Sequence, residues 1–211
     1  MIRVLLADDH QIVRDGLKRI LGATADIAVA GEAGSGDEAL ALVRGNDYDL
    51  AVLDLSMPGL AGIDLVKRLK AEKPKLKLLV LSMHGEQQYA ARALKAGAAG
   101  YLTKDSAAQQ LVGAIRKVAA GGVHISEAAA ASLIEGSASD GPLHARLSDR
   151  EYEVFRLLAA GRSPTEIARR LHLSVKTVST HKTRILEKLR LGGTAELVRY
   201  ALEHRLLDDK A

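Results

Sequence analysis

The sequence predicts an α/β domain with a doubly wound, five-stranded parallel sheet, followed by a small all-α domain. Short apolar runs alternate with amphipathic segments as far as residue 120, which is typical of consecutive βα units. A stretch rich in Gly, Ser and Asp then interrupts the pattern at residues 136–142. Beyond this stretch the apolar residues recur at helical spacing, with no strand-like alternation.

The elements of the first domain can be placed one by one. Apolar runs of four to seven residues indicate buried parallel strands at 2–7, 27–33, 49–53, 77–81 and 99–102. Amphipathic segments indicate helices near 11–22, 36–44, 60–72, 86–96 and 106–120. Gly121 and Gly122 are expected to end the last of these helices, so the first domain is expected to span residues 1–121.

The second domain is predicted to contain four helices, at 149–160, 164–171, 175–190 and 194–205. Ser148 and Glu151 have the spacing of a capping box at the start of the first. The turn at 172–174 is as short as the turn of a helix-turn-helix motif. We expect this domain to span 146–208, with 122–145 as the linker between the two domains.

Composition excludes several classes of function. The chain has no Cys, which excludes disulfides, thiolate metal sites and a Cys nucleophile. With no Trp and one Phe, stacking on single-stranded nucleic acid is not expected to be central. The apolar runs fall far short of the ~20 residues that cross a bilayer. The acidic pair Asp8 and Asp9 comes too early for a signal sequence. We therefore expect a soluble, cytoplasmic protein with no membrane partner.

Positive charge is concentrated in the second domain. Residues 1–124 carry 16 Lys/Arg and 14 Asp/Glu, a net charge of +2, whereas residues 141–194 carry 11 and 5, a net charge of +6. Such an excess on a small domain suits nucleic-acid binding. A solvated basic face explains the charge alone equally well.

Polar residues follow the apolar runs at the positions where the strands should end. Asp8 and Asp9 follow the first run, Asp54 the third, Ser82 the fourth and Lys104 the fifth. The carboxyl ends of the strands in an open α/β sheet border the crevice where ligands bind, so these side chains are expected to converge. Carboxylates, with a backbone carbonyl just after the strand, suit Mg²⁺. Lys104 and the metal would stabilise a phosphoryl group in transfer to Asp54, since aspartate forms acyl phosphates.

The first domain closely resembles the receiver domain of two-component response regulators, which has the CheY-like variant of the flavodoxin fold. The resemblance rests on LLADDH, AVLDLSMPGLAGIDL, LVLSMH and KAGAAGYLTKD, and covers about residues 1–120. It implies that Asp54 is the phospho-acceptor and that Asp8, Asp9, Asp54 and the carbonyl of Ser56 hold Mg²⁺. His10 has no His, Cys or Glu partner at metal-ligand spacing, so we expect it only to begin a helix. The other site residues implied by the resemblance are the switch residues Ser82 and Tyr101 and the phosphoryl-contacting Lys104.

The third helix of the second domain is predicted to present a polar face to DNA. Its apolar residues recur at helical spacing and belong to a small core, which leaves hydroxyl and basic side chains on the exposed side. In a major groove such side chains reach base edges or phosphates. The segment LSDREYEVFRLLAAGRSPTEIARRLHLSVKTVSTHKTRILEKLRL resembles the LuxR-type helix-turn-helix of the NarL/FixJ response regulators, and the resemblance covers about residues 146–206. The candidate DNA contacts are Lys176, Thr177, Ser179, Thr180, Lys182, Thr183 and Arg184.

Together the two resemblances imply a sequence-specific transcription regulator controlled by phosphorylation of Asp54. Such a protein catalyses only its own phosphoryl transfer and dephosphorylation. The expected partners are a sensor histidine kinase, promoter DNA and RNA polymerase. The family also implies a homodimer, favoured by phosphorylation and formed through the last helix near 194–205. The apolar residues of that helix fit such an interface, and fit burial within the monomer equally well; they are Leu197, Val198, Ala201 and Leu202.

Three alternatives use the same residues differently. A metal-dependent phosphatase with an Asp nucleophile would need a second catalytic Asp two residues beyond Asp54, where Ser56 stands. A regulator that acts only through protein contacts would not need the basic third helix. A receiver that works without phosphorylation would not need the complete acidic site.

Overall fold

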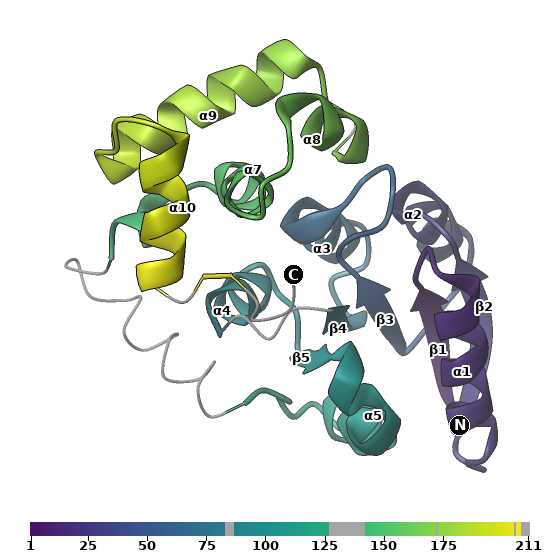
Figure 1. Cartoon of the computed structure of the whole chain (residues 1–211). Helices are drawn as coiled ribbons and strands as arrows, with labels where there is room; N and C mark the ends of the chain where they lie inside the picture. Colours follow the sequence, from purple (N-terminus) through teal and green to yellow (C-terminus); the bar gives the residue numbers. More distant parts are fainter. Residues whose placement is uncertain (83–86, 127–141, 172, 205, 208–211) are drawn as a thin grey trace. The chain divides into compact units, whose positions relative to one another are not determined.

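Five parallel strands form one sheet, as the sequence predicts, and their order in the sheet is β2-β1-β3-β4-β5. The computed structural model describes residues 1–82, 87–126, 142–171, 173–204 and 206–207 (Figure 1). The strand order reverses between β1 and β3, which is where open α/β sheets bind ligands. The strands are β1 Ile2–Ala7, β2 Ile27–Ala33, β3 Leu50–Asp54, β4 Lys77–Ser82 and β5 Gly100–Thr103.

Helices cover both faces of this sheet, so the fold is doubly wound (Figure 1). Alternate strand residues such as Val4, Val52 and Leu81 form one buried cluster with Leu17 of α1 and Leu111 of α5. α2, α3 and α4 lie on the opposite face (Figure 1). These helices are α1 Gln11–Gly22, α2 Gly36–Gly45, α3 Gly62–Glu72, α4 Gln87–Lys95 and α5 Lys104–Ala119.

The strands end at the same level, which brings the polar residues after them to one edge. Ala7 of β1 is the register partner of Leu53, and Asp54 is the partner of Leu81. Ser82, at the end of β4, is the partner of Thr103. The predicted convergence at the carboxyl edge therefore follows from the pairing of four neighbouring strands.

The chain that leaves α5 returns to the edge of the sheet. His124 forms a parallel bridge with Gly100: the N–H of Tyr101 donates to the His124 carbonyl at 2.8 Å, and the N–H of His124 donates to the Ala99 carbonyl at 3.1 Å. Gly100 lacks the Cβ that would lie 3.1 Å from the His124 carbonyl oxygen. The first residues of the predicted linker thus belong to the α/β unit.

The C-terminal unit is helical in its described residues. Contacts within the chain divide it into two compact units, Met1–Ala130 and Ala131–Ala211. Capping boxes begin α7 and α8, with Ser148 and Glu151 forming the first as predicted. Tyr152 and Phe155 are fully buried in the core of this unit. Its elements are the 3₁₀ helix η1 Leu143–Arg146 and the helices α7 Asp149–Ala159, α8 Pro164–Arg170, α9 Val175–Leu189 and α10 Thr194–Glu203.

The far end of the predicted linker is also part of a folded unit. His144 of η1 is buried, and its Nδ1 lies 2.9 Å from the hydroxyl of Tyr200 in α10. Residues 127–141 of the predicted linker lie outside the described residues. Within the described ranges, every helix is too short or too polar to cross a membrane.

Candidate functional site

Two buried carboxylates lie at the carboxyl edge of the sheet. The side chains of Asp8 and Asp54 are 2 % and 1 % exposed. Asp8 follows β1, whose last four residues are apolar and buried, and Asp54 ends β3 after four buried apolar residues, so the backbone fixes where the carboxylates stand. Oδ1 of Asp54 accepts the backbone N–H of Ser56 at 2.9 Å. This turn after β3 places the backbone of Ser56 beside the Asp54 carboxylate.

Lys104 connects these two carboxylates. Its Nζ lies 2.6 Å from Oδ2 of Asp8 and 2.7 Å from Oδ2 of Asp54, and its side chain is 8 % exposed. Burial lowers the pKa of the Lys104 ammonium, but the hydrogen bonds that it donates to Asp54 and Asp8 more than offset burial and raise the pKa above its usual value. Lys104 is therefore a fixed positive charge between two buried negative charges.

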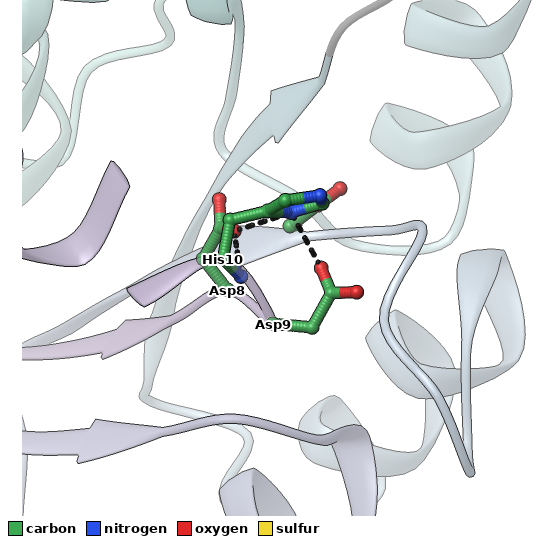
Figure 2. Close-up of side chains that lie close together, drawn as sticks. Asp8, Asp9 and His10 are labelled. Carbon is green, nitrogen blue, oxygen red and sulfur yellow. Dashed lines mark hydrogen bonds and ion pairs between the residues drawn. The ribbon is translucent and has the colours of Figure 1, made fainter. Parts of the chain in front are cut away.

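Asp9 and His10 form the exposed rim of the same site (Figure 2). Nδ1 of His10 lies 2.9 Å from Oδ1 of Asp9 and 3.3 Å from Oδ1 of Asp8. The side chains of Asp9 and His10 are 31 % and 63 % exposed. The expectation that His10 only begins a helix missed this arrangement: it is the N-cap of α1, but its side chain makes no capping bond and is directed at the two carboxylates.

The residues at this edge fit a divalent cation. Asp8, Asp9, His10 and Asp54 each offer one ligand atom, and these atoms all lie within 4.8 Å of one another. Carboxylate oxygens are the ligands that Mg²⁺ prefers. The sequence prediction named the three aspartates, and the structure brings them together with His10, which that prediction had set aside as a ligand.

The predicted switch residues lie next to this edge. Ser82 ends β4 and is 1 % exposed, and Tyr101 lies on the neighbouring strand β5 and is 8 % exposed. β4 pairs with β3, and Asp54 is the register partner of Leu81, the residue directly before Ser82. Tyr101 is held through its backbone to His124, which links the start of the linker to the strand that carries the predicted aromatic switch.

Six of the seven predicted DNA contacts lie on the exposed side of α9. Val178, Ile185 and Leu189 of this helix are buried in the core of the C-terminal unit. The opposite side carries polar residues: Lys176, Ser179, Thr180, Thr183 and Arg184 are exposed, and Thr177 is partly exposed. Lys182 is four residues after Val178, so it borders the buried side and is partly exposed. Burial of the apolar side therefore fixes which side of α9 meets the solvent, as the periodicity predicts.

The hydroxyl groups on this face are already donors within the helix. Ser179 donates to the carbonyl of Val175, and Thr180 donates to that of Lys176, each at 3.0 Å. Thr183 donates to the carbonyl of Ser179 at 3.2 Å. A hydroxyl oxygen that donates keeps its lone pairs, so each of these groups can also accept from a base amino group without breaking the bond to the helix.

A buried carboxylate fixes α9 on α7. Glu151, whose side chain is 5 % exposed, accepts the Ser148 N–H at 2.7 Å and lies 2.6 Å from Nζ of Lys188. Burial raises the pKa of Glu151, but the hydrogen bonds from Lys188 and Ser148 outweigh burial and lower the pKa below its usual value. The capping box of one helix thus also anchors the helix that carries the predicted DNA contacts.

Family models match both units of the chain. The response regulator receiver domain matches residues 4–116, and the luxR family of bacterial regulatory proteins matches residues 145–201. Response regulator UvrY of Escherichia coli K12 is 38 % identical over 210 residues, which cover 98 % of this chain and 96 % of the relative. The oxygen regulatory protein NreC of Staphylococcus carnosus is 36 % identical over 217 residues, which cover 98 % of this chain and all of the relative.

Solved structures of similar sequence have the same fold. A structure of the RcsB response regulator of Salmonella typhimurium has a TM-score of 0.75 and 31 % identity, and the match covers 96 % of this chain and 97 % of that one. RcsB bound to the promoter rprA with the phosphomimetic BeF₃⁻ has a TM-score of 0.69 and 30 % identity, covering 94 % and 97 %. The match therefore includes both units of the chain.

Proposed function

This chain belongs to the response regulators that join a receiver domain to a LuxR-type DNA-binding domain, and we propose that phosphorylation of Asp54 controls its binding to promoter DNA. The observation that carries the proposal is the ammonium of Lys104 held between Asp8 and Asp54 at the carboxyl edge of the sheet. This edge supplies a buried nucleophilic carboxylate, a fixed positive charge and two further carboxylates. The polar face of α9 supplies the surface for DNA.

The receiver catalyses its own phosphorylation through these groups. A carboxylate oxygen of Asp54 attacks the phosphorus of a phosphohistidine or of a small acyl phosphate, and the donor leaves with the electron pair of the broken bond. Lys104 then contacts an oxygen of the transferred phosphoryl group instead of the free carboxylate. Asp8, Asp9, Asp54 and the Ser56 carbonyl would hold Mg²⁺, which neutralises negative charge on the carboxylates and the phosphoryl oxygens when it is bound.

The phosphoryl group on Asp54 changes the contacts that the free carboxylate makes with Lys104 and with the Ser56 N–H. Ser82 turns its hydroxyl to the new oxygens, and Tyr101 repacks on β5 in response. The switch is a local change in charge that biases a buried element with two arrangements. Because Tyr101 is bonded through its backbone to His124, the change also reaches the start of the linker.

The DNA-binding unit is proposed to act as a dimer on promoter half-sites, as dimers of helix-turn-helix proteins do. RcsB has been solved as two dimers on two parallel DNAs. In this chain Leu197 and Ala201 of α10 are fully buried within the monomer, while Leu202 is 60 % exposed. Leu197 and Ala201 therefore pack within the monomer, and the exposed Leu202 with the partly buried Val198 could contact a second copy of the chain.

The first experiment measures retention of a genomic fragment pool, with and without acetyl phosphate and Mg²⁺. The wild type is compared with Asp54→Asn, and with Asp47→Asn as the control because the Asp47 side chain is 95 % exposed. The proposal expects the phosphodonor to strengthen selective binding in the wild type and the control only. Equal binding by all three proteins under both conditions would show that Asp54 does not control DNA binding. Phosphoryl incorporation into Asp54→Asn would show that Asp54 is not the phospho-acceptor.

A further inference from the structure

The side chain of His10 contacts the acidic pair and does not cap the helix that it begins. It stands at the N-cap of α1, where Ser, Thr, Asp and Asn are preferred because their side chains accept backbone N–H groups. The His10 side chain accepts none; its backbone carbonyl accepts the N–H groups of Val13 and Arg14, and its own N–H donates to Oδ1 of Asp8 at 2.9 Å. Its ring is instead directed at the acidic pair (Figure 2).

The carboxylate oxygens that face His10 are those that Lys104 leaves open. Lys104 lies against Oδ2 of Asp8 and Oδ2 of Asp54. Oδ1 of Asp8 and Oδ1 of Asp9 are within 3.3 Å and 2.9 Å of Nδ1 of His10. The acidic site therefore has two sides, one closed by the lysine and one on which oxygens and an imidazole nitrogen meet.

These separations match those of neighbouring ligands around one ion. Two ligands at right angles, each ~2.1 Å from a metal, lie ~3.0 Å from one another. The distances from His10 Nδ1 to Oδ1 of Asp9 and of Asp8, 2.9 and 3.3 Å, bracket this value. Small shifts of exposed side chains thus suffice to place one ion between all three groups, since Asp9 and His10 are the exposed members of the set.

We propose that His10 is a nitrogen ligand of the cation site and determines its selectivity, so that borderline ions such as Co²⁺, Ni²⁺ and Zn²⁺ bind there in preference to Mg²⁺. Imidazole suits these ions, whereas Mg²⁺ prefers oxygen and retains its waters. The inference rests on the proposed function, because it takes the cation of phosphoryl transfer to bind at Asp8, Asp9 and Asp54. If the inference holds, the divalent ion that occupies the site depends on which metals surround the protein.

The test uses the full-length, untagged protein with one equivalent of Co²⁺, and X-ray absorption at the cobalt edge. Outer-shell scattering from an imidazole is expected in the wild type and is expected to be lost in His10→Asn. Asn is a favoured N-cap, so this substitution preserves the start of α1. His84→Gln is measured in parallel, because His84 lies close to Ser82 in sequence but outside the described residues.

Calorimetric titration of the same proteins with Co²⁺ and Mg²⁺ gives the selectivity. His10→Asn is expected to weaken Co²⁺ binding about tenfold or more, as loss of a group that tunes a metal site does, and to change Mg²⁺ binding less than about threefold. Absence of imidazole scattering in the wild type, its persistence in His10→Asn, or equal weakening of both ions would each overturn the inference.

The two proposals fail in different ways. If Mg²⁺ binds and acetyl phosphate modifies Asp54, but Co²⁺ has no imidazole ligand, only the role of His10 is lost. If Mg²⁺ does not bind the wild type at all, the proposed phosphoryl chemistry at this edge is lost, and the role of His10 with it.

Discussion

Replacing Lys104 by Met should destabilise the receiver unit, because two buried carboxylates would lose the positive charge that they share. The side chains of Asp8 and Asp54 are 2 % and 1 % exposed, and Lys104 lies 2.6 and 2.7 Å from them. Removing one partner of a buried ion pair costs about 3–5 kcal/mol. Because one lysine serves both carboxylates, the two losses overlap, and we expect about 3–5 kcal/mol in total without a divalent cation.

Amide hydrogen exchange of β3 measures this loss within the receiver unit, apart from the C-terminal unit. Every 1.4 kcal/mol is tenfold, so in EDTA the exchange of these amides should accelerate by about 10²- to 4 × 10³-fold. Lys117→Met is the matched control, since Lys117 lies on the same helix α5 and is exposed, and should change stability by about 0.5 kcal/mol at most.

The same reasoning gives a prediction of opposite sign for the double variant. Adding Asp54→Asn to Lys104→Met removes one of the two uncompensated charges, so exchange of the β3 amides should slow again. Mg²⁺ should also narrow the gap between Lys104→Met and the wild type, because a bound cation supplies the missing positive charge. Less than tenfold acceleration in EDTA, or a double variant less stable than Lys104→Met, would refute this account of the site.

Three further predictions concern other parts of the chain. Lys182→Ala should weaken DNA binding on all sequences and reduce the slope of log K against log salt by about 1, measured by fluorescence anisotropy; an unchanged slope would contradict a phosphate contact. Glu151 has a folded-state pKa below its unfolded value, so the stability that it contributes is present above about pH 4.3 and is lost as pH falls through the folded pKa. Glu151→Gln should therefore flatten the decline of Tm between about pH 5 and pH 3, the range in which carboxylates protonate. A decline as steep as that of the wild type would exclude this role. Gly100→Ala places a Cβ 2.7 Å from a methyl of Leu79 and should destabilise the receiver by about 1–3 kcal/mol in urea unfolding; Gly113→Ala, with open space around it on α5, should instead stabilise by about 0.5–1 kcal/mol, and equal effects would show that packing at Gly100 is not limiting.

Sequence alone placed the acidic site because strand ends can be read from local pattern. The run before Asp54 is apolar throughout and the residues after it form a turn, so the carboxylate had to stand at the end of a buried strand. The position of Lys104 after the last strand followed in the same way from the run GYLT. The exposed face of α9 was equally accessible, because burial of Val178 and Ile185 fixes it.

Features that depend on pairing between distant segments could not be predicted in this way. His10 has no His, Cys or Glu partner close in sequence, and Asp54 approaches it only because β1 pairs with β3. The N-cap position of His10, a residue poorly suited to capping, was the one local signal that its side chain is used elsewhere. The apolar face of α10 was equally ambiguous, since its periodicity is the same whether the partner of Leu197 is α7 or a second copy.

The bridge between Gly100 and His124 determines where the receiver can be separated from the rest of the chain. β5 is the last strand of the sheet, and its outer edge is covered at Ala99 and Tyr101 by the backbone of His124. A recombinant fragment that stops at Gly121 would leave these groups unpaired, and an open strand edge is a template for pairing with another chain. Such a fragment should self-associate edge to edge through β5, and this dimerisation would result from where the fragment was truncated. A fragment that extends through Ser126 keeps the hydrogen bonds from His124 to this edge.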